Sequence, residues 1–439
     1  MEKFRLSVLG CQVLALLLSA GVAAGQPSAD NSATPETPAS PPPLAAGAEA
    51  PLPAAEAPPP ASEAPQPEKP KTGKALKVIY DKGIAFATED GEFRTKINLR
   101  NQIRLESTRP TEPGSEVTNR IYIVRSRLQL EGNVFGEDNR YKLAFGLGDK
   151  GSFSFIKDLY IDKAAGSAWI RIGQWKRPFN RQEIVSDFTS QLNERANTAD
   201  YSGGGRDLGM AIHNDYEKSP EGLEWVLGVF NTFNGGSDRP VITTTCTQGM
   251  TAITCVNPAP TNFPADWGPT VIARVGWNSK GIKGYSEGDL EGGPLRFAVG
   301  ASYKIDLADF DQGKQSSEAQ NMSHGLEADA MVKIEGFSLE LGGFAMKAKS
   351  ADATFGAMAQ AGMFVVPKHG EIAARFGIVP TTGDRRQIEV RGAFNWYWEG
   401  HRWKWATDFG FVQQTGRDPV TMATDDPVLL LRSMAQLTF

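Results

Sequence analysis

One segment near residue 100 alternates between polar and mostly apolar side chains. Between residues 93 and 106 the odd positions are apolar or Thr, except for Asn101, and every even position is polar. Four of the even positions carry cations: Arg94, Lys96, Arg100 and Arg104. Guanidinium and ammonium groups on one face of a strand can pass an anion between charge-assisted hydrogen bonds. The spacing therefore predicts anion binding or conduction along one face.

Further cations fall on the same faces of later segments. We expect these to point the same way: Arg125, Arg127, Arg140, Lys142, Arg171, Arg274, Arg296, Lys304 and Arg375. The alternative is that they are ion-paired wall residues, because carboxylates are available to them at Asp158, Asp162, Glu327, Asp329, Glu340 and Glu371. Both interpretations stay open from the sequence.

The long connection 176–206 is the predicted constriction element. Its apolar residues Ile184, Val185, Phe188 and Leu192 recur at helical spacing, which predicts a short helix packed against a wall. Six residues are its candidate functional side chains: Arg177, Arg181, Glu194, Arg195, Arg206 and Asp207. An extracellular surface loop is the alternative.

Signals for catalysis are weak. The four histidines (His213, His324, His369 and His401) have no metal-ligand spacing, and neither a nucleophile elbow nor a phosphate-binding loop is present. We expect no enzyme activity, no cofactor and no metal. The net charge of −5 gives no indication of a nucleic-acid partner. Cys246 and Cys255 are candidates for a local disulfide, with free thiols or a metal site as poorer alternatives.

The elements that must position these residues are strands. The fourteen-residue alternation exceeds the roughly five or six residues of an ordinary strand and suits a tilted crossing of a bilayer. Sixteen segments have strand character: 93–106, 119–132, 139–149, 154–163, 168–175, 207–215, 222–231, 270–278, 294–305, 323–335, 336–348, 355–366, 370–379, 387–398, 401–413 and 428–439. The predicted fold is an all-β, transmembrane, antiparallel barrel of sixteen strands.

The connections between these strands sort by length. Every second link is short, whereas the links at 107–118, 176–206, 232–269, 306–322 and 414–427 are long. This is typical of outer-membrane barrels, which have short turns on one side and long loops on the other. The link 279–293 is long and breaks the pattern.

Aromatic residues agree with that topology. Trp396, Trp398, Trp403 and Trp405 flank one short turn, which predicts an interfacial aromatic girdle, with carbohydrate stacking as the alternative. The last segment ends at Phe439, an ending that looks like the signal read by the machinery that assembles bacterial outer-membrane barrels.

The first 74 residues differ in composition from the rest. Residues 1–24 have a basic start, an apolar run and a small-residue end, which predict a cleaved signal peptide and export, with an uncleaved anchor as the alternative. Residues 25–74 are rich in Pro, Ala and Glu and predict a disordered periplasmic spacer. Residues 75–439 are the predicted barrel domain.

Several short motifs resemble those of the phosphate-selective porins of the O and P type. They are residues 173–179 (Gly-Gln-Trp-Lys-Arg-Pro-Phe), Glu194-Arg195, residues 205–209 (Gly-Arg-Asp-Leu-Gly), 228–231, 361–367, 371–375, Gly400-His401 and the terminal Phe439. The resemblance implies a sixteen-stranded, usually trimeric barrel that passes phosphate or related anions passively. The full arginine ladder of the phosphate-specific members is not matched, and the proline spacer is not a general feature of the family.

The sequence thus predicts an outer-membrane porin for small solutes, with phosphate-like anions as the expected class. We expect outer-membrane lipid and further copies of the chain in a homotrimer as its partners. A porin without anion preference, or a barrel acting as a surface receptor or adhesin, are the alternatives.

Overall fold

The computed structural model describes most of the chain after residue 74. The described residues are 75–80, 83–149, 152–231, 245–248, 253–256, 269–307, 323–347, 352–381, 384–416 and 425–439. The predicted signal peptide and spacer lie outside the described residues.

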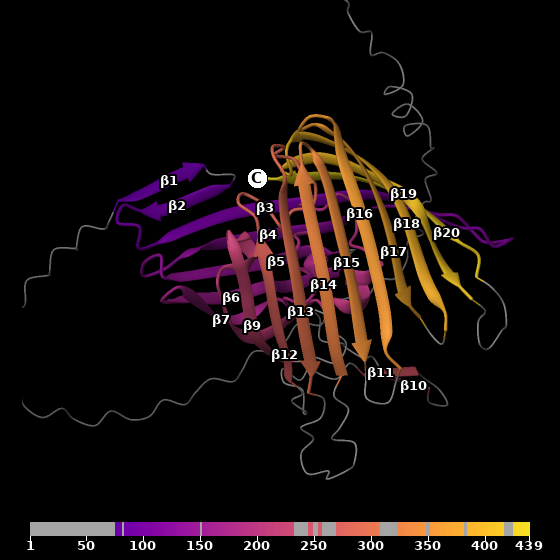
Figure 1. Cartoon of the computed structure of the whole chain (residues 1–439), viewed down its shortest axis with the longest axis horizontal. Helices are drawn as coiled ribbons and strands as arrows, with labels where there is room; N and C mark the ends of the chain where they lie inside the picture. Colours follow the sequence, from indigo (N-terminus) through magenta and orange to yellow (C-terminus); the bar gives the residue numbers. More distant parts are fainter. Residues whose placement is uncertain are drawn as a thin grey trace, which may run out of the picture. The chain divides into compact units, whose positions relative to one another are not determined.

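Sixteen strands form a closed antiparallel barrel (Figure 1). Each strand from β3 to β9 pairs with the next, β9 pairs with β12, the pairing continues to β20, and β20 pairs back to β3. The strands are β3 (Arg94–Pro110), β4 (Thr118–Asn133), β5 (Asn139–Asp149), β6 (Ser152–Ala165), β7 (Ala168–Lys176), β8 (Arg206–His213), β9 (Gly222–Asn231), β12 (Pro269–Asn278), β13 (Arg296–Asp306), β14 (Ser323–Ile334), β15 (Phe337–Lys347), β16 (Thr354–Val366), β17 (Gly370–Pro380), β18 (Arg386–Glu399), β19 (Trp403–Thr415) and β20 (Val428–Thr438). The predicted fold is confirmed.

Two hairpins were not predicted from the sequence. The first joins β1 (Leu76–Tyr80) to β2 (Ile84–Thr88), and β2 pairs with the start of β3. Because β20 pairs only with the later part of β3, from Arg100 onward, this hairpin continues the sheet beyond the end of β20. The second joins β10 (Thr245–Gln248) to β11 (Ile253–Val256) and sets Cys246 opposite Cys255 in its register. The disulfide between them stays a prediction.

The alternation of the sequence separates an inner and an outer face. In β3, Gln102 and Arg104 are buried on the inside, whereas Ile103 between them is 51% exposed on the outside. The same exposure of large apolar side chains continues around the barrel, for example at Ile172, Leu341 and Phe409. The outer surface is thus apolar and the cationic face of the first strand points inward.

The tryptophans near the turn 400–402 belong to the outer face. Trp396 pairs across the ladder with Trp405, and Trp398 stacks on Trp403 with ring centroids 4.8 Å apart. Phe439 follows β20, and its backbone exchanges two hydrogen bonds with Leu99. These positions match the predicted girdle and closing strand.

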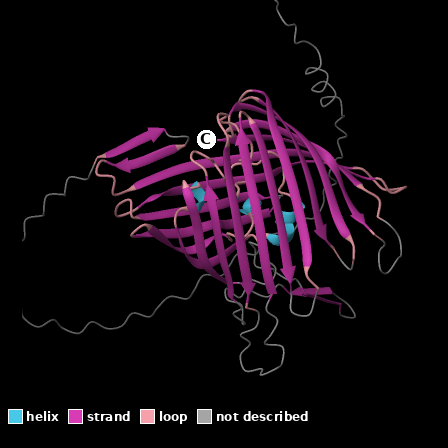
Figure 2. Cartoon of the chain, in the orientation of Figure 1, coloured by secondary structure: helices cyan, strands magenta, loops and turns pink. Residues whose placement is uncertain are grey.

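The helices are short and lie inside the barrel (Figure 2). They are α2 (Arg181–Ile184) and α3 (Asn197–Ser202), both in the connection between β7 and β8, with a 3-10 turn η1 (Tyr216–Lys218) between β8 and β9. Asn180 caps α2 by accepting a hydrogen bond from the Glu183 amide. Among the described residues, no helix has the length and hydropathy needed to span a bilayer.

Candidate functional site

The connection 177–205, here called the constriction loop, folds into the barrel and is bonded to the wall. Nearly all of its side chains are buried, and many are polar. Burying polar groups is costly unless each finds a hydrogen-bond partner. The inward faces of the strands provide these partners, so the connection packs against the wall and the surface-loop alternative does not apply. The predicted helix is wrong in place, because Val185, Phe188 and Leu192 lie in turns and bends between the short helices 181–184 and 197–202.

On one side, Glu194 of the constriction loop is held by two wall arginines. Arg104 Nη1 lies 2.6 Å from Glu194 Oε1, and Arg125 Nη2 lies 2.6 Å from Glu194 Oε2. Arg104 also donates to the carbonyl of Asn193 at 2.6 Å. Two cations of the predicted anion-binding faces are therefore occupied by a carboxylate of the protein itself.

Asp187 is the second anionic anchor of the constriction loop. Its carboxylate lies 2.7 Å from Arg195 Nη2 and 2.9 Å from Arg127 Nη1. Burial alone would raise the pKa of Asp187, but the guanidinium groups of Arg195, Arg125 and Arg127 reverse this effect and hold the pKa well below its ordinary value. Asp187 therefore remains ionised and keeps the loop attached to β4.

On the opposite side, the loop is bonded to the later strands. Arg181 Nε donates to Asp329 Oδ1 of β14 at 2.6 Å, and Gln191 Nε2 donates to Glu371 Oε1 of β17 at 2.6 Å. The amide of Asn193 donates to Asp408 of β19 at 2.9 Å. The loop thus crosses the lumen and is fixed at both sides.

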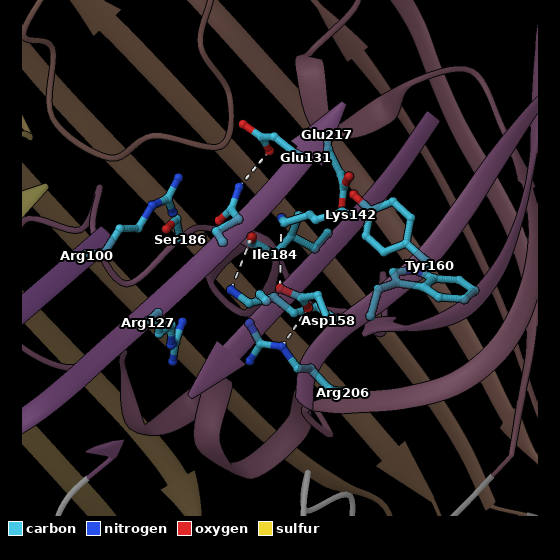
Figure 3. Close-up of a pocket in the computed structure, with 14 residues that line it drawn as sticks. Arg100, Arg127, Glu131, Lys142, Asp158, Tyr160, Ile184, Ser186, Arg206 and Glu217 are labelled. Carbon is cyan, nitrogen blue, oxygen red and sulfur yellow. Dashed lines mark hydrogen bonds and ion pairs between the residues drawn. The ribbon is translucent and has the colours of Figure 1, made fainter. Parts of the chain in front are cut away.

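A cavity of about 230 Å³ remains between the constriction loop and strands β3 to β8 (Figure 3). Its charged lining consists of the cations Arg100, Arg127, Lys142, Lys176 and Arg206 and the acids Glu131, Asp158 and Glu217. Arg206 Nε lies 2.8 Å from Asp158 Oδ1, and Lys142 Nζ lies 3.9 Å from Asp158 Oδ2. Cations outnumber acids in this lining by five to three.

Arg100 and Arg127 line the cavity from adjacent strands, and Arg127 is also paired with Asp187 at 2.9 Å. They are direct cross-strand partners of β3 and β4, an arrangement in which like charges repel. Both guanidinium groups lie over the ring of Phe188 in the constriction loop, at 5.5 and 5.8 Å from its centroid. Throughout the described part of the chain no carboxylate lies within 4 Å of Arg100, and its Nε has no hydrogen-bond partner. Glu131, Asp158 and Asp187 act on its charge at longer range.

Most other predicted wall cations are paired with acids. Arg171 bonds Asp162 at 2.7 Å, and Arg274 bonds Asp329 at 2.7 Å. Arg375 lies 3.6 Å from Glu389 and donates to the Glu194 carbonyl at 2.8 Å. The remaining cations that the sequence placed on these faces also face acids: Arg140 with Asp215, Arg296 with Asp289 and Lys304 with Asp306. The ion-paired alternative thus describes these residues.

The other candidates hold the loop ends or lie away from the cavity. Arg177 donates to the Gly204 carbonyl at 2.5 Å and lies 3.8 Å from Asp207. Arg195 donates to the Gln182 carbonyl at 2.9 Å. Arg94 and Lys96 lie in the part of β3 that pairs with β2 and do not themselves line the cavity, although Lys96 is the cross-strand partner of the lining residue Glu131.

Sequence reasoning missed a second inward connection, residues 279–295 between β12 and β13. Glu287 is 2% exposed, and Gly288 and Asp289 beside it are also buried. Its unusual length was the available signal, but length alone does not say whether a turn folds inward.

The described ranges contain no group of three or more His, Cys, Asp or Glu side chains placed to hold a metal ion. Of the histidines, His213 lies 3.5 Å from Asp162, and His401 lies 3.4 Å from Ser286.

Comparison with known proteins gives similarities of fold. No family model and no curated protein sequence matches the chain. Among solved structures, the anion-selective porin from Comamonas acidovorans has 10% identity and a TM-score of 0.47, covering 79% of this chain and 99% of its own. The outer membrane channel DcaP of Acinetobacter baumannii has 10% identity and a TM-score of 0.48, covering 81% and 99%. At these identities the likeness concerns the fold alone, and the resemblance to phosphate-selective porins stays a prediction.

Proposed function

We propose that this protein is an outer-membrane diffusion channel for small solutes, with a preference for anions. The observation that carries the proposal is the constriction loop folded inside a closed barrel, with a cation-rich cavity beside it. An apolar outer surface with tryptophans near the short turns suits a bilayer, and a polar lumen suits hydrated solutes. Phosphate is one member of the expected solute class.

The anion preference rests on Arg100 and its neighbours. Arg100 and Arg127 face the cavity from adjacent strands. Among the described residues no carboxylate lies within 4 Å of Arg100, and Glu131 acts on its charge at longer range. A guanidinium group in a narrow, partly desolvated passage lowers the energy of an entering anion more than it would in bulk water. Selectivity would then depend on a few residues rather than on a continuous cationic ladder.

A porin with little charge preference is the second candidate. It is favoured by the many wall cations that face acids, including Arg171, Arg274 and Arg104. Paired charges leave only a small net potential for a passing ion. In the anion-preferring porin the cations of the cavity determine ion selectivity. In the unselective porin the paired charges of the wall cancel, and no preference results.

Planar-bilayer recording distinguishes these functions. The purified chain should conduct, and its reversal potential under a KCl gradient should show preference for chloride, with phosphate competing for the same passage. A reversal potential near zero would favour the unselective porin. If the folded protein gave no conductance at all, the receptor or adhesin function would replace the channel. Assembly as a homotrimer and recognition of Phe439 by the assembly machinery remain predictions of the sequence.

A further inference from the structure

The connection 279–295 enters the lumen from the side of the short turns and meets the constriction loop. Here it is called the opposing loop. It is anchored to the wall by Asp289, which bonds Arg296 at 2.6 Å and accepts from the Gly336 amide at 2.9 Å. Lys333 of β14 donates to the Ser286 carbonyl at 2.6 Å. These bonds fix the opposing loop in place.

Three hydrogen bonds join the two loops directly. Glu287 Oε2 accepts from the Gln191 amide at 2.6 Å, and the Glu287 amide donates to the Thr189 carbonyl at 3.2 Å. Arg181 Nη1 donates to the Gly284 carbonyl at 2.6 Å. Two connections from opposite ends of the barrel thus become one bonded unit inside it.

Glu287 is also the link from this unit to the wall. The same Oε2 atom accepts from Gln360 Nε2 of β16 at 2.7 Å, and Gln360 Nε2 in turn lies 2.8 Å from Gln191 Oε1. A buried carboxylate holds such donors more strongly than a neutral acceptor does. One oxygen atom therefore orients the tip of the constriction loop against β16.

The wall leaves room for this tip by having no side chain at one position. A Cβ atom added to Gly362 of β16 would collide with Gln191 Nε2. Gly288 of the opposing loop is similar, since a Cβ atom there would collide with Glu371 Oε1. The two glycines thus allow the close approach of loop and wall.

We propose that the opposing loop is a second constriction element and that Glu287 is the positioning residue for the constriction loop. The joined loops fill the part of the lumen facing β14 to β19, because their bonds reach Asp329, Gln360, Glu371, Asn395 and Asp408. Solutes are thereby confined to the cavity beside β3 to β8. This inference rests on the proposed channel function.

Glu287→Ala and Glu287→Gln test the positioning role. The alanine variant loses the acceptor, so single-channel conductance should rise several-fold with more frequent fluctuations. The glutamine variant keeps one oxygen in place, which can accept both bonds, and should restore conductance close to wild type. Glu291→Gln is the matched control on the same loop, because Glu291 pairs with the exposed Lys283 at 2.5 Å and makes no hydrogen bond or ion pair with the constriction loop within the described residues. Its conductance should not change.

Hydrogen exchange of residues 186–194 gives a readout that does not need conduction. These amides should lose protection in Glu287→Ala and keep it in Glu287→Gln and Glu291→Gln. Unchanged protection in Glu287→Ala would overturn the positioning role, whatever the conductance. The wild type could lack conductance while Glu287→Ala still loses protection. That result would contradict the proposed channel function but support the role of Glu287 in attaching the constriction loop. Gly362→Ala, which displaces Gln191 without touching Glu287, should reproduce the exchange result if Glu287→Ala does not fold.

Discussion

The Nε atom of Arg181 lies 2.6 Å from Oδ1 of Asp329, and both side chains are 1% exposed. The pair joins α2 of the constriction loop to β14 across 148 residues of sequence. Asp329 also bonds Arg274 at 2.7 Å, and Glu327 and Glu224 lie 3.3 and 3.4 Å from the same guanidinium group. Buried charges arranged in this way are stable only as a set.

Asp329→Asn should release the constriction loop. Removing one partner of a buried ion pair leaves an uncompensated charge, so the free energy of unfolding should fall by about 3–5 kcal/mol. Urea titration of the barrel in detergent measures the loss, and bilayer recording should show larger, noisier openings. Lys218→Gln is the control, since it removes an exposed pair with Asp215 and should change stability by less than about 0.5 kcal/mol. Equal unfolding free energies of Asp329→Asn and Lys218→Gln would contradict the role of the Arg181–Asp329 pair in holding the constriction loop.

Arg100→Gln should lower anion preference without lowering stability. The substitution removes the cation without a carboxylate partner, and it relieves repulsion with Arg127 directly opposite on β4. The reversal potential should shift toward zero, while urea titration gives an unfolding free energy equal to or above that of the wild type. Arg109→Gln on the outer face of β3 is the control and should alter neither quantity. An unchanged reversal potential in Arg100→Gln would mean that the cavity does not set selectivity.

Acid should detach the constriction loop only at low pH. The folded pKa of Asp187 is depressed below its ordinary 3.8 by Arg195, Arg125 and Arg127, although burial alone would raise it. Its contribution to stability is therefore fully present above that ordinary value and is lost as pH falls through the folded pKa. The part of the wild-type conductance that depends on Asp187 should stay constant from neutral pH down to about pH 4 and change below it. Asp187→Asn should abolish this acid response, and a transition near neutral pH would exclude Asp187 as its source.

Leu341→Arg tests the proposed membrane-facing surface. Leu341 lies in the middle of β15 on the outer face and is 45% exposed. A cation at the bilayer midplane costs about 2–4 kcal/mol, so the folded fraction in vesicles should fall at intermediate urea. Leu341→Met keeps the apolar volume and should behave as wild type. Equal stability of both variants in vesicles would place this face outside the bilayer.

The sequence predicted the strands well because each carries its own signal. Alternation in β3 follows from the two-residue period of a strand, and a register error would exchange its inner and outer faces. The β1–β2 hairpin was missed, because two short apolar segments do not by themselves predict strands. Only the pairing of β2 with β3 shows that they belong to the sheet. The hairpin pairs with the part of β3 that β20 does not reach, and no local sequence pattern predicts where β20 ends.

The sequence predicted which charged residues point into the barrel, but it did not predict which of them pair with one another. Arg100 and Arg104 occupy equivalent even positions of one strand, yet Arg104 binds Glu194 and Arg100 faces the cavity. Glu287 gave no signal at all, because a carboxylate in a turn is ordinarily exposed. Only the meeting of two distant loops makes it buried and bonded.

The sequence by itself determined a sixteen-stranded barrel with an apolar outside and a charged inside, since side-chain alternation and link lengths are local properties. Tertiary structure decided which charges neutralise one another, because ion pairing depends on distances across the lumen, such as that from Arg181 to Asp329. It also decided that the connections 177–205 and 279–295 join inside the barrel. The inner cations provide the charge, and the folded loops determine which of them a solute can reach.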